Sequence, residues 1–211
     1  MVRPKRRGQR PQGFTLLEML IVVAIIAITS ALAAPAIHQS IMERKGSEAS
    51  LDLVRLGRRA RSSAIAYGRA HVVRFDPGGA GEPGRFRVYR GVSSGCNAVS
   101  NDWATIIDGG PACGVDDSFC IDWLDLGESE WTLGSSRIRA RENGALALVD
   151  ICYEPRGTVL HRTAALARFS NINNVNGGYV FSFDRLDGGG SVTGVSRRVV
   201  MSLGGDARPL L

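Results

Sequence analysis

The sequence predicts an α+β protein, in which one long N-terminal helix packs on a C-terminal head of antiparallel β-sheet. Residues 14–37 form an apolar run whose only charged side chain is Glu18. Apolar side chains then recur every three or four residues as far as Tyr67, which is the spacing of one helix face. Beyond Gly68, short runs of alternating apolar residues are separated by glycine-rich turns, and this pattern predicts strands.

The apolar run is long enough to cross a membrane. Its 24 residues would form a helix about 36 Å long, against a hydrocarbon core of about 30 Å. Before it stand five basic residues and no acidic one: Arg3, Lys5, Arg6, Arg7 and Arg10. Such a segment stays cytoplasmic, so everything after residue 40 is expected outside. An ordinary secretory signal peptide is the alternative, with Ala31-Leu32-Ala33 as its cleavage site.

The formal net charge of +6 is concentrated in that basic segment. The rest of the chain carries 21 basic and 20 acidic side chains, which nearly balance. Nucleic-acid-binding domains usually present a basic face, and the overall charge gives no sign of one.

Glu18 is the unusual residue of the apolar run. A carboxylate inside a membrane costs at least a few kcal/mol, so it is by default a sign of function with a partner still to be named. The alternative is that its side chain reaches the membrane interface and has no role.

Six residues around Glu18 carry a resemblance to a known family. Gly13-Phe14-Thr15-Leu16-Leu17-Glu18 resembles the processing motif of type IV pilins and type II secretion pseudopilins, and Pro35 stands in the same register. The resemblance implies that prepilin peptidase cuts after Gly13 and that Phe14 becomes a methylated N-terminus. It also implies that Glu18 pairs with the N-terminal amine of a neighbouring subunit, because opposite charges attract strongly at low dielectric. Glu18 would thereby set the register of assembly.

Residues 38–68 are expected to continue the helix as an amphipathic segment. Its apolar face consists of Ala49, Leu53, Leu56, Ala60, Ala64 and Tyr67. Pro35 is expected to kink or loosen the helix, and Gly68 to end it. The arginines of this segment are interpreted as a solvated helix face in preference to a phosphate site; they are Arg55, Arg58, Arg59 and Arg61.

Residues 69–211 are the predicted β-rich head. Residues 70–75 and 85–89 flank a turn rich in glycine and proline and predict a hairpin. Residues 131–141 and 145–153 predict a second strand pair around Glu142-Asn143-Gly144. Two further strands are joined by a turn at residues 187–190. Their apolar faces are Tyr179, Phe181 and Phe183 in the first, and Val195, Val199, Met201 and Leu203 in the second.

The four cysteines are expected to form disulfides, and scattered buried free thiols are the alternative. An even count beyond a membrane anchor fits an oxidising compartment, and the spacing indicates no metal site. Three pairings of Cys96, Cys113, Cys120 and Cys152 remain open. Three of these cysteines lie in a long irregular insert at residues 91–125. The aspartates of the insert match no EF-hand spacing and are interpreted as solvated loop charge, so no metal or cofactor is expected.

One motif suggests catalysis. Gly91-Val92-Ser93-Ser94-Gly95 matches the G-x-S-x-G of a nucleophile elbow, and His161 follows later in the chain. The motif needs a strand–turn–helix context, and no apolar helical repeat follows it. The chain is therefore predicted not to be an enzyme.

Segments later in the chain indicate which group of pilin-like proteins the sequence resembles. Residues 58–68, 155–159 and 197–203 are similar to the FimT/GspH group of minor pilins and pseudopilins, whose heads have two facing sheets. Some members bind DNA through a Gly-Arg-rich C-terminal motif. The corresponding residues 204–209 depart from it, because Asp206 stands where a cation would help.

The resemblance implies a minor pilin that helps to prime a type IV pilus and presents its head. A pseudopilin of a type II secretion system, or a DNA-binding minor pilin for DNA uptake, remains an alternative. The expected partners are prepilin peptidase, the major pilin, other minor pilins and a tip adhesin, with DNA less favoured. The expected location is the inner membrane with a periplasmic head, and then the fibre or its tip.

Overall fold

The computed structural model describes residues 14–79, 81–108, 113, 119–142, 148–164, 167–171, 178–202 and 204–210. The chain divides into two compact units, Met1–Gln39 and Ser40–Leu211. The first unit holds the apolar run. The second, here called the head, holds the rest of the helix and the strands of the described residues.

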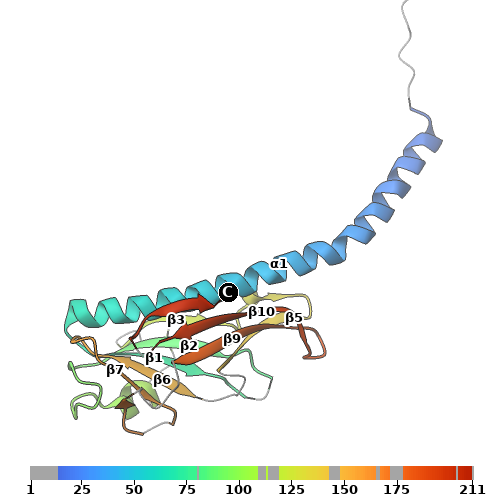
Figure 1. Ribbon diagram of the computed structural model, residues 1–211. Coiled ribbons are helices and arrows are strands. Elements are labelled where there is room, and N and C mark those ends of the chain that lie inside the picture. Colours follow the sequence, from blue (N-terminus) through green and yellow to red (C-terminus); the bar gives the residue numbers. More distant parts are fainter. Residues whose placement is uncertain are drawn as a thin grey trace, which may run out of the picture. The chain divides into compact units, whose positions relative to one another are not determined.

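One long helix, α1 (Leu16–Tyr67), contributes to both units and is blue to cyan in Figure 1. Pro35 lies within α1, so its missing N–H does not end the helix. The helix ends as predicted at Gly68, whose φ of 65° is the left-handed conformation that glycine adopts at little cost.

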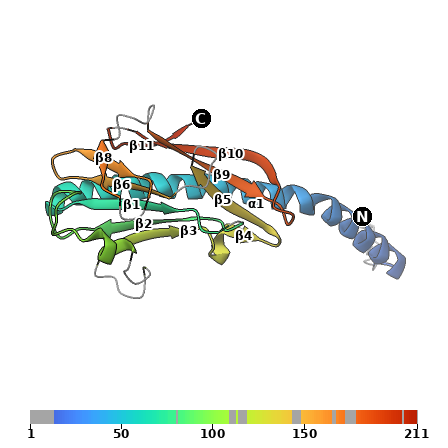
Figure 2. The same cartoon turned by 90° about the horizontal axis from the view of Figure 1, so that it is seen from below.

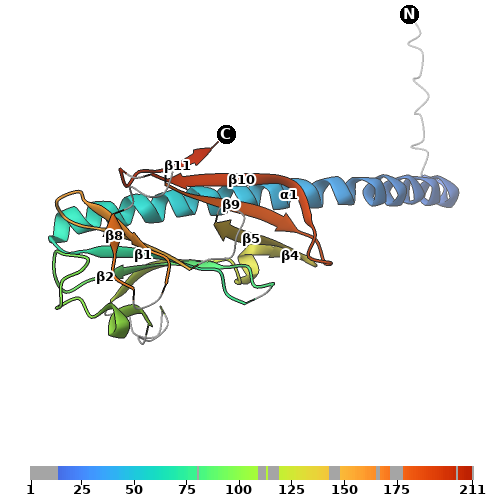
Figure 3. The ribbon, with the colours of Figure 1, turned by 60° about the horizontal axis from the view of Figure 1, so that its bottom comes forward.

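The strands of the head form two antiparallel sheets. The order is β3-β2-β1-β6-β7-β8 in the first sheet and β11-β10-β9-β5-β4 in the second. The first sheet contains β1 (His71–Asp76), β2 (Arg85–Arg90), β3 (Cys120–Asp125), β6 (Val149–Tyr153), β7 (Val159–Arg162) and β8 (Ser170–Asn171). The second contains β4 (Thr132–Leu133), β5 (Ser136–Glu142), β9 (Tyr179–Leu186), β10 (Val192–Met201) and β11 (Ala207–Leu210). Two short helical turns, η1 (Ala104–Asp108) and η2 (Ser129–Trp131), join strands. Figures 2 and 3 show β1 and β2 in one layer and β9 and β10 in the other.

The main core lies where residues 40–67 of α1 meet both sheets. The helix contributes Met42, Ala49, Leu53, Val54, Leu56, Ala60 and Ala64. The ring centroids of Phe86 in the first sheet and Phe181 in the second are 5.2 Å apart, so the sheets face each other across this core. Burial of apolar side chains is the dominant favourable term in folding, and here one helix and two sheets share it. The predicted α+β class is confirmed.

The opposite face of the first sheet is also covered. A second cluster joins strand residues to the segment between β2 and β3; its members are Ala70, Val72, Tyr89, Cys96, Trp103, Ile106, Ile107, Cys120, Cys152 and Phe169. As a result all five residues of β6 are buried. A strand that is buried on both faces does not show alternation in its sequence.

The predicted hairpin is present, with His71 opposite Arg90 and Asp76 opposite Arg85. The second predicted strand pair is wrong, because its two segments lie in different sheets. β5 pairs with β9, whereas β6 pairs with β1 and β7. The turn signal at residues 142–144 does not decide which sheet the next strand joins. Residues 143–147 themselves lie outside the described residues.

Three further expectations are corrected. Tyr67, on the predicted buried helix face, is 66% exposed at the last turn. Val195 is 60% exposed, because a bulge between Thr193 and Arg197 breaks the alternation of β10. The irregular insert is interrupted by a strand, since residues 120–125 form β3. Leu203 lies outside the described residues.

Candidate assembly site at the N-terminal helix

Thr15 caps the start of α1. The backbone N–H of Glu18 donates to Oγ1 of Thr15 over 3.2 Å, and that of Met19 donates to the Thr15 carbonyl oxygen. This is half of a capping box, in which a Thr-x-x-Glu sequence satisfies backbone donors of the first turn. Sequence reasoning missed this role of Thr15, although the spacing of Thr15 and Glu18 signals it.

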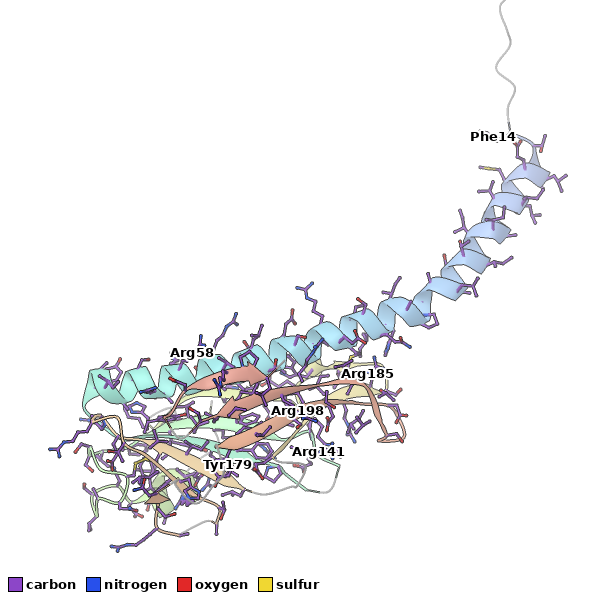
Figure 4. The ribbon with its side chains drawn as sticks, viewed as in Figure 1. Phe14, Arg58, Arg141, Tyr179, Arg185 and Arg198 are labelled. Atoms are coloured by element: carbon purple, nitrogen blue, oxygen red, sulfur yellow. A yellow bond between two sulfur atoms is a disulfide. The ribbon has the colours of Figure 1, made fainter. Side chains whose placement is uncertain are left out.

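The cap places Glu18 in the first turn of the helix. The helix dipole favours negative charge there, which lowers the cost of holding a carboxylate in an apolar segment. Phe14 precedes the cap and is 76% exposed; Figure 4 labels it. Gly13 and the residues before it lie outside the described residues.

The apolar run exposes its side chains around the whole helix. Every residue from Phe14 to Ile37 is exposed, including Leu16 at 84% and Leu32 at 76%. By length and composition this helix is able to cross a membrane. A helix that is apolar on all sides needs lipid or other helices around it.

Comparison with known proteins agrees with this geometry. Residues 9–34 match the family model of the prokaryotic N-terminal methylation motif. The N-terminal segment is type IV pilin-like. No curated protein and no solved structure matches the chain. The motif indicates a structural protein that is anchored in a membrane, processed by prepilin peptidase and assembled with other pilins. It ends at residue 34, just before Pro35, and does not reach the head.

Disulfides join Cys96 to Cys152 and Cys113 to Cys120. The first connects the segment after β2 to β6, over a sequence separation of 56 residues. The second joins Cys113 to the first residue of β3, over a sequence separation of 7 residues. The pairing depends on which strand lies under the insert, which is why sequence reasoning left three possibilities open.

A buried charge cluster lies on the face of the first sheet that the second apolar cluster covers, opposite the main core. Asp150 is fully buried and accepts hydrogen bonds from Nε and Nη2 of Arg74, both at 2.7 Å, and from Nε of Arg162 at 2.6 Å. Arg162 also stacks on the ring of Phe169, 4.8 Å from its centroid. The register places these three charged residues side by side on β1, β6 and β7. Sequence reasoning missed the cluster because it depends on strand order.

The residues of the suggested catalytic motif do not meet. The Ser93 backbone N–H donates to Oδ1 of Asn101, within an irregular loop that is no nucleophile elbow. His161 instead lies 2.5 Å from Tyr179, measured between Nδ1 and the phenol oxygen, and its Nε2 is 3.3 Å from Oγ of Ser170. Burial lowers the pKa of His161 and raises the pKa of Tyr179 to about 12.

Most of the helix arginines are engaged in ion pairs. Arg55 pairs with Asp52 and Arg59 with Asp122, both at 2.7 Å. Arg61 pairs with Asp206 at 2.6 Å, so this carboxylate neutralises a cation at the C-terminal end of the head. In the described part of the chain, no three His, Cys, Asp or Glu side chains come together as metal ligands. Asp116 and Asp117 of the insert lie outside that part.

Proposed function

We propose that this protein is a minor pilin that helps to prime the assembly of a type IV pilus. Prepilin peptidase removes residues 1–13 by cutting after Gly13, and Phe14 becomes the methylated N-terminus. Residues 14–37 insert among the helices of other pilins, and residues 38–68 continue that helix to the β-rich part of the head, residues 69–211. The head lies in the periplasm and then on the fibre or its tip, where a tip adhesin is a further partner.

The observation that carries this proposal is the overlap of two features. The N-terminal methylation motif covers residues 9–34, and residues 16–34 of that motif form the start of a capped helix that is apolar on all sides. A secretory signal peptide needs neither the motif nor a helix that continues past its cleavage site.

Glu18 is proposed to set the register of assembly. Its carboxylate is expensive in hydrocarbon, and the cap at Thr15 and the helix dipole offset only part of that cost. Pairing with the N-terminal amine of a neighbouring subunit supplies the rest, because a buried charge is tolerated when it is paired.

The insert supports a minor role over that of a bulk subunit. Two disulfides and a second apolar cluster fix it over one face of the first sheet. A bulk subunit must pack against many copies of itself, which a large insertion hinders.

The test compares sheared surface fibres from cells that carry Glu18→Ala, Glu18→Gln, a deletion of the protein, or Glu43→Ala. Glu43 is an exposed acid of the same helix outside the apolar run, so its variant is the matched control. We expect fibres to be lost in both Glu18 variants and in the deletion, and to be normal with Glu43→Ala. Normal fibres in the deletion would contradict a pilus-priming role. The amount of secreted protein in the same cells would then test the type II secretion alternative.

A further inference from the structure

Five arginines lie on the outer face of the second sheet, here called the arginine face: Arg137, Arg139, Arg141, Arg198 and Arg208. Phe181 and Phe183 point into the main core, so the residues between them point outward. Ser182 pairs in register with both Arg141 and Arg198, and Val200 pairs with Arg208, which puts these arginines on the outer side. Figure 4 labels Arg141 and Arg198.

The arginine face carries more positive charge than its own acid can neutralise. Asp184 lies among the arginines, 1% exposed, and accepts hydrogen bonds from Nε of Arg141 at 2.7 Å and Oγ of Ser196 at 2.6 Å. It faces Arg139 in the register, but Nε of Arg139 is buried without an acceptor in the described structure. Arg198 and Arg208 are exposed.

A groove of opposite charge lies elsewhere on the head, between α1 and β3. It has a volume of about 370 Å³ and is here called the acidic groove. Its charged lining residues are Asp52, Arg55, Arg59, Asp122, Asp125, Glu128 and Glu130. Arg55 and Arg59 are already bound to acids of the same groove, at 2.7 Å each. The acids therefore outnumber the bases by five to two.

Two tryptophans line the acidic groove together with its acids. Trp131 lines it and is 6% exposed, and its buried indole Nε1 has no acceptor among the described residues. Trp123 lines it and is 45% exposed. An exposed indole offers a face on which a guanidinium stacks, and carboxylates bind guanidinium groups in a bidentate manner.

We propose that the arginine face of one copy of this chain docks on the acidic groove of a second copy. The two surfaces have opposite charge and the side-chain chemistry that pairs best across interfaces, arginine with carboxylate and tryptophan. Nucleic acid is the less suitable partner, since Asp184 within the face would repel phosphates and the acidic groove would remain unused. The proposal goes beyond the proposed function, because it concerns the head and requires no fibre.

The experiment measures self-association of the full chain in detergent micelles by sedimentation velocity. The face variant is Arg198→Glu with Arg208→Glu, and the groove variant is Glu128→Lys with Glu130→Lys. All four side chains are exposed, so neither variant disturbs the core. The control is Arg58→Glu with Arg156→Glu, two exposed residues outside both surfaces that change the net charge by the same amount as the face variant.

We expect wild type and control to associate at low salt, with affinity falling at least about tenfold in about 0.5 M NaCl. Each of the two surface variants should stay monomeric alone. A mixture of the two should associate, because the intact groove of one meets the intact face of the other. Residues 14–39 are unchanged in every sample, so association through the apolar helix does not separate the variants. A monomeric wild type, or a mixture that fails to associate, would overturn the proposal. So would a monomeric wild type that binds a DNA duplex through the arginine face.

Discussion

Gly57 of α1 lies directly against Met201 of β10. A Cβ atom at Gly57 would stand 2.9 Å from Cε of Met201 and 3.0 Å from Cβ of Ala207. The helix backbone therefore approaches the second sheet as closely as a residue without a side chain allows. Gly46 lies earlier on the same helix, nearer the apolar run, and has more space. A Cβ atom added there would have Cδ1 of Ile138 as its nearest neighbour, at 3.7 Å.

This difference predicts opposite effects for two similar substitutions. Gly57→Ala should lower the free energy of unfolding of the head by about 1–3 kcal/mol, because overpacking displaces neighbours. Gly46→Ala should be neutral or stabilise by up to about 1 kcal/mol, since alanine is the better helix former. Thermal unfolding of the full chain in detergent, followed by circular dichroism, compares them. Equal effects of the two would contradict the close packing at Gly57.

The buried cluster around Asp150 predicts a large cost for removing its acid. Asp150→Asn should lower the free energy of unfolding by about 3–5 kcal/mol, because two buried guanidinium groups lose their counter-charge. The control is Asp122→Asn, which removes the partner of the exposed Arg59 and should cost at most about 1 kcal/mol. Denaturant titration of both variants measures the difference. A cost below that of Asp122→Asn would show that the cluster is solvated.

The two disulfides predict unequal contributions to stability. Cys96–Cys152 closes a separation of 56 residues and Cys113–Cys120 one of 7. By chain entropy these correspond to about 4 and about 2 kcal/mol, because the longer loop restricts the unfolded chain more. Unfolding of Cys96→Ser/Cys152→Ser and Cys113→Ser/Cys120→Ser chains measures each contribution. A larger loss from the shorter bridge would reverse this account.

Two histidines of the head, the buried His71 and the partly buried His161, predict that the head loses stability in acid. Burial lowers the pKa of His71 and of His161 below 6.5, the ordinary value that each regains on unfolding. Below that pH the unfolded chain takes up protons that the folded head does not, so stability is full above it and falls as pH drops. The midpoint of thermal unfolding should therefore decrease between about pH 7.5 and about pH 5.5.

Variants separate the histidines from other causes of acid sensitivity. His161→Asn should flatten the pH dependence of the midpoint, whatever its effect on the midpoint itself. His38→Asn, outside the head, is the control. An unchanged pH slope in His161→Asn would exclude His161 as a source of that dependence.

Local patterns in the sequence were enough for the helix, its end at Gly68 and the β1–β2 hairpin. The assignment of β5 and β6 to one strand pair was wrong. The partner of a strand depends on contacts with segments that are distant in the sequence, here β9 for β5 and β1 for β6. The Asp150 cluster was missed for the same reason. Its three members come from three different strands, β1, β6 and β7.

The functional residues likewise divide into those that a local sequence motif predicts and those that only the strand order brings together. Phe14 and Glu18 belong to one short motif, which sequence reasoning found, and Thr15 stood between them with a capping role that was overlooked. The alternation of Arg137, Arg139 and Arg141 along β5 puts them on one strand face, a signal that sequence reasoning missed. Only the order of β5, β9, β10 and β11 adds Arg198 and Arg208 to that face.

Processing as a pilin-like subunit is tested most directly at the N-terminus of the protein. Intact mass and N-terminal sequencing of the protein extracted from membranes identify that N-terminus. We predict a single form that begins at Phe14 and carries one added methyl group. A form that begins just after Ala33, or one that keeps the leader, would contradict assignment as a processed pilin-like subunit.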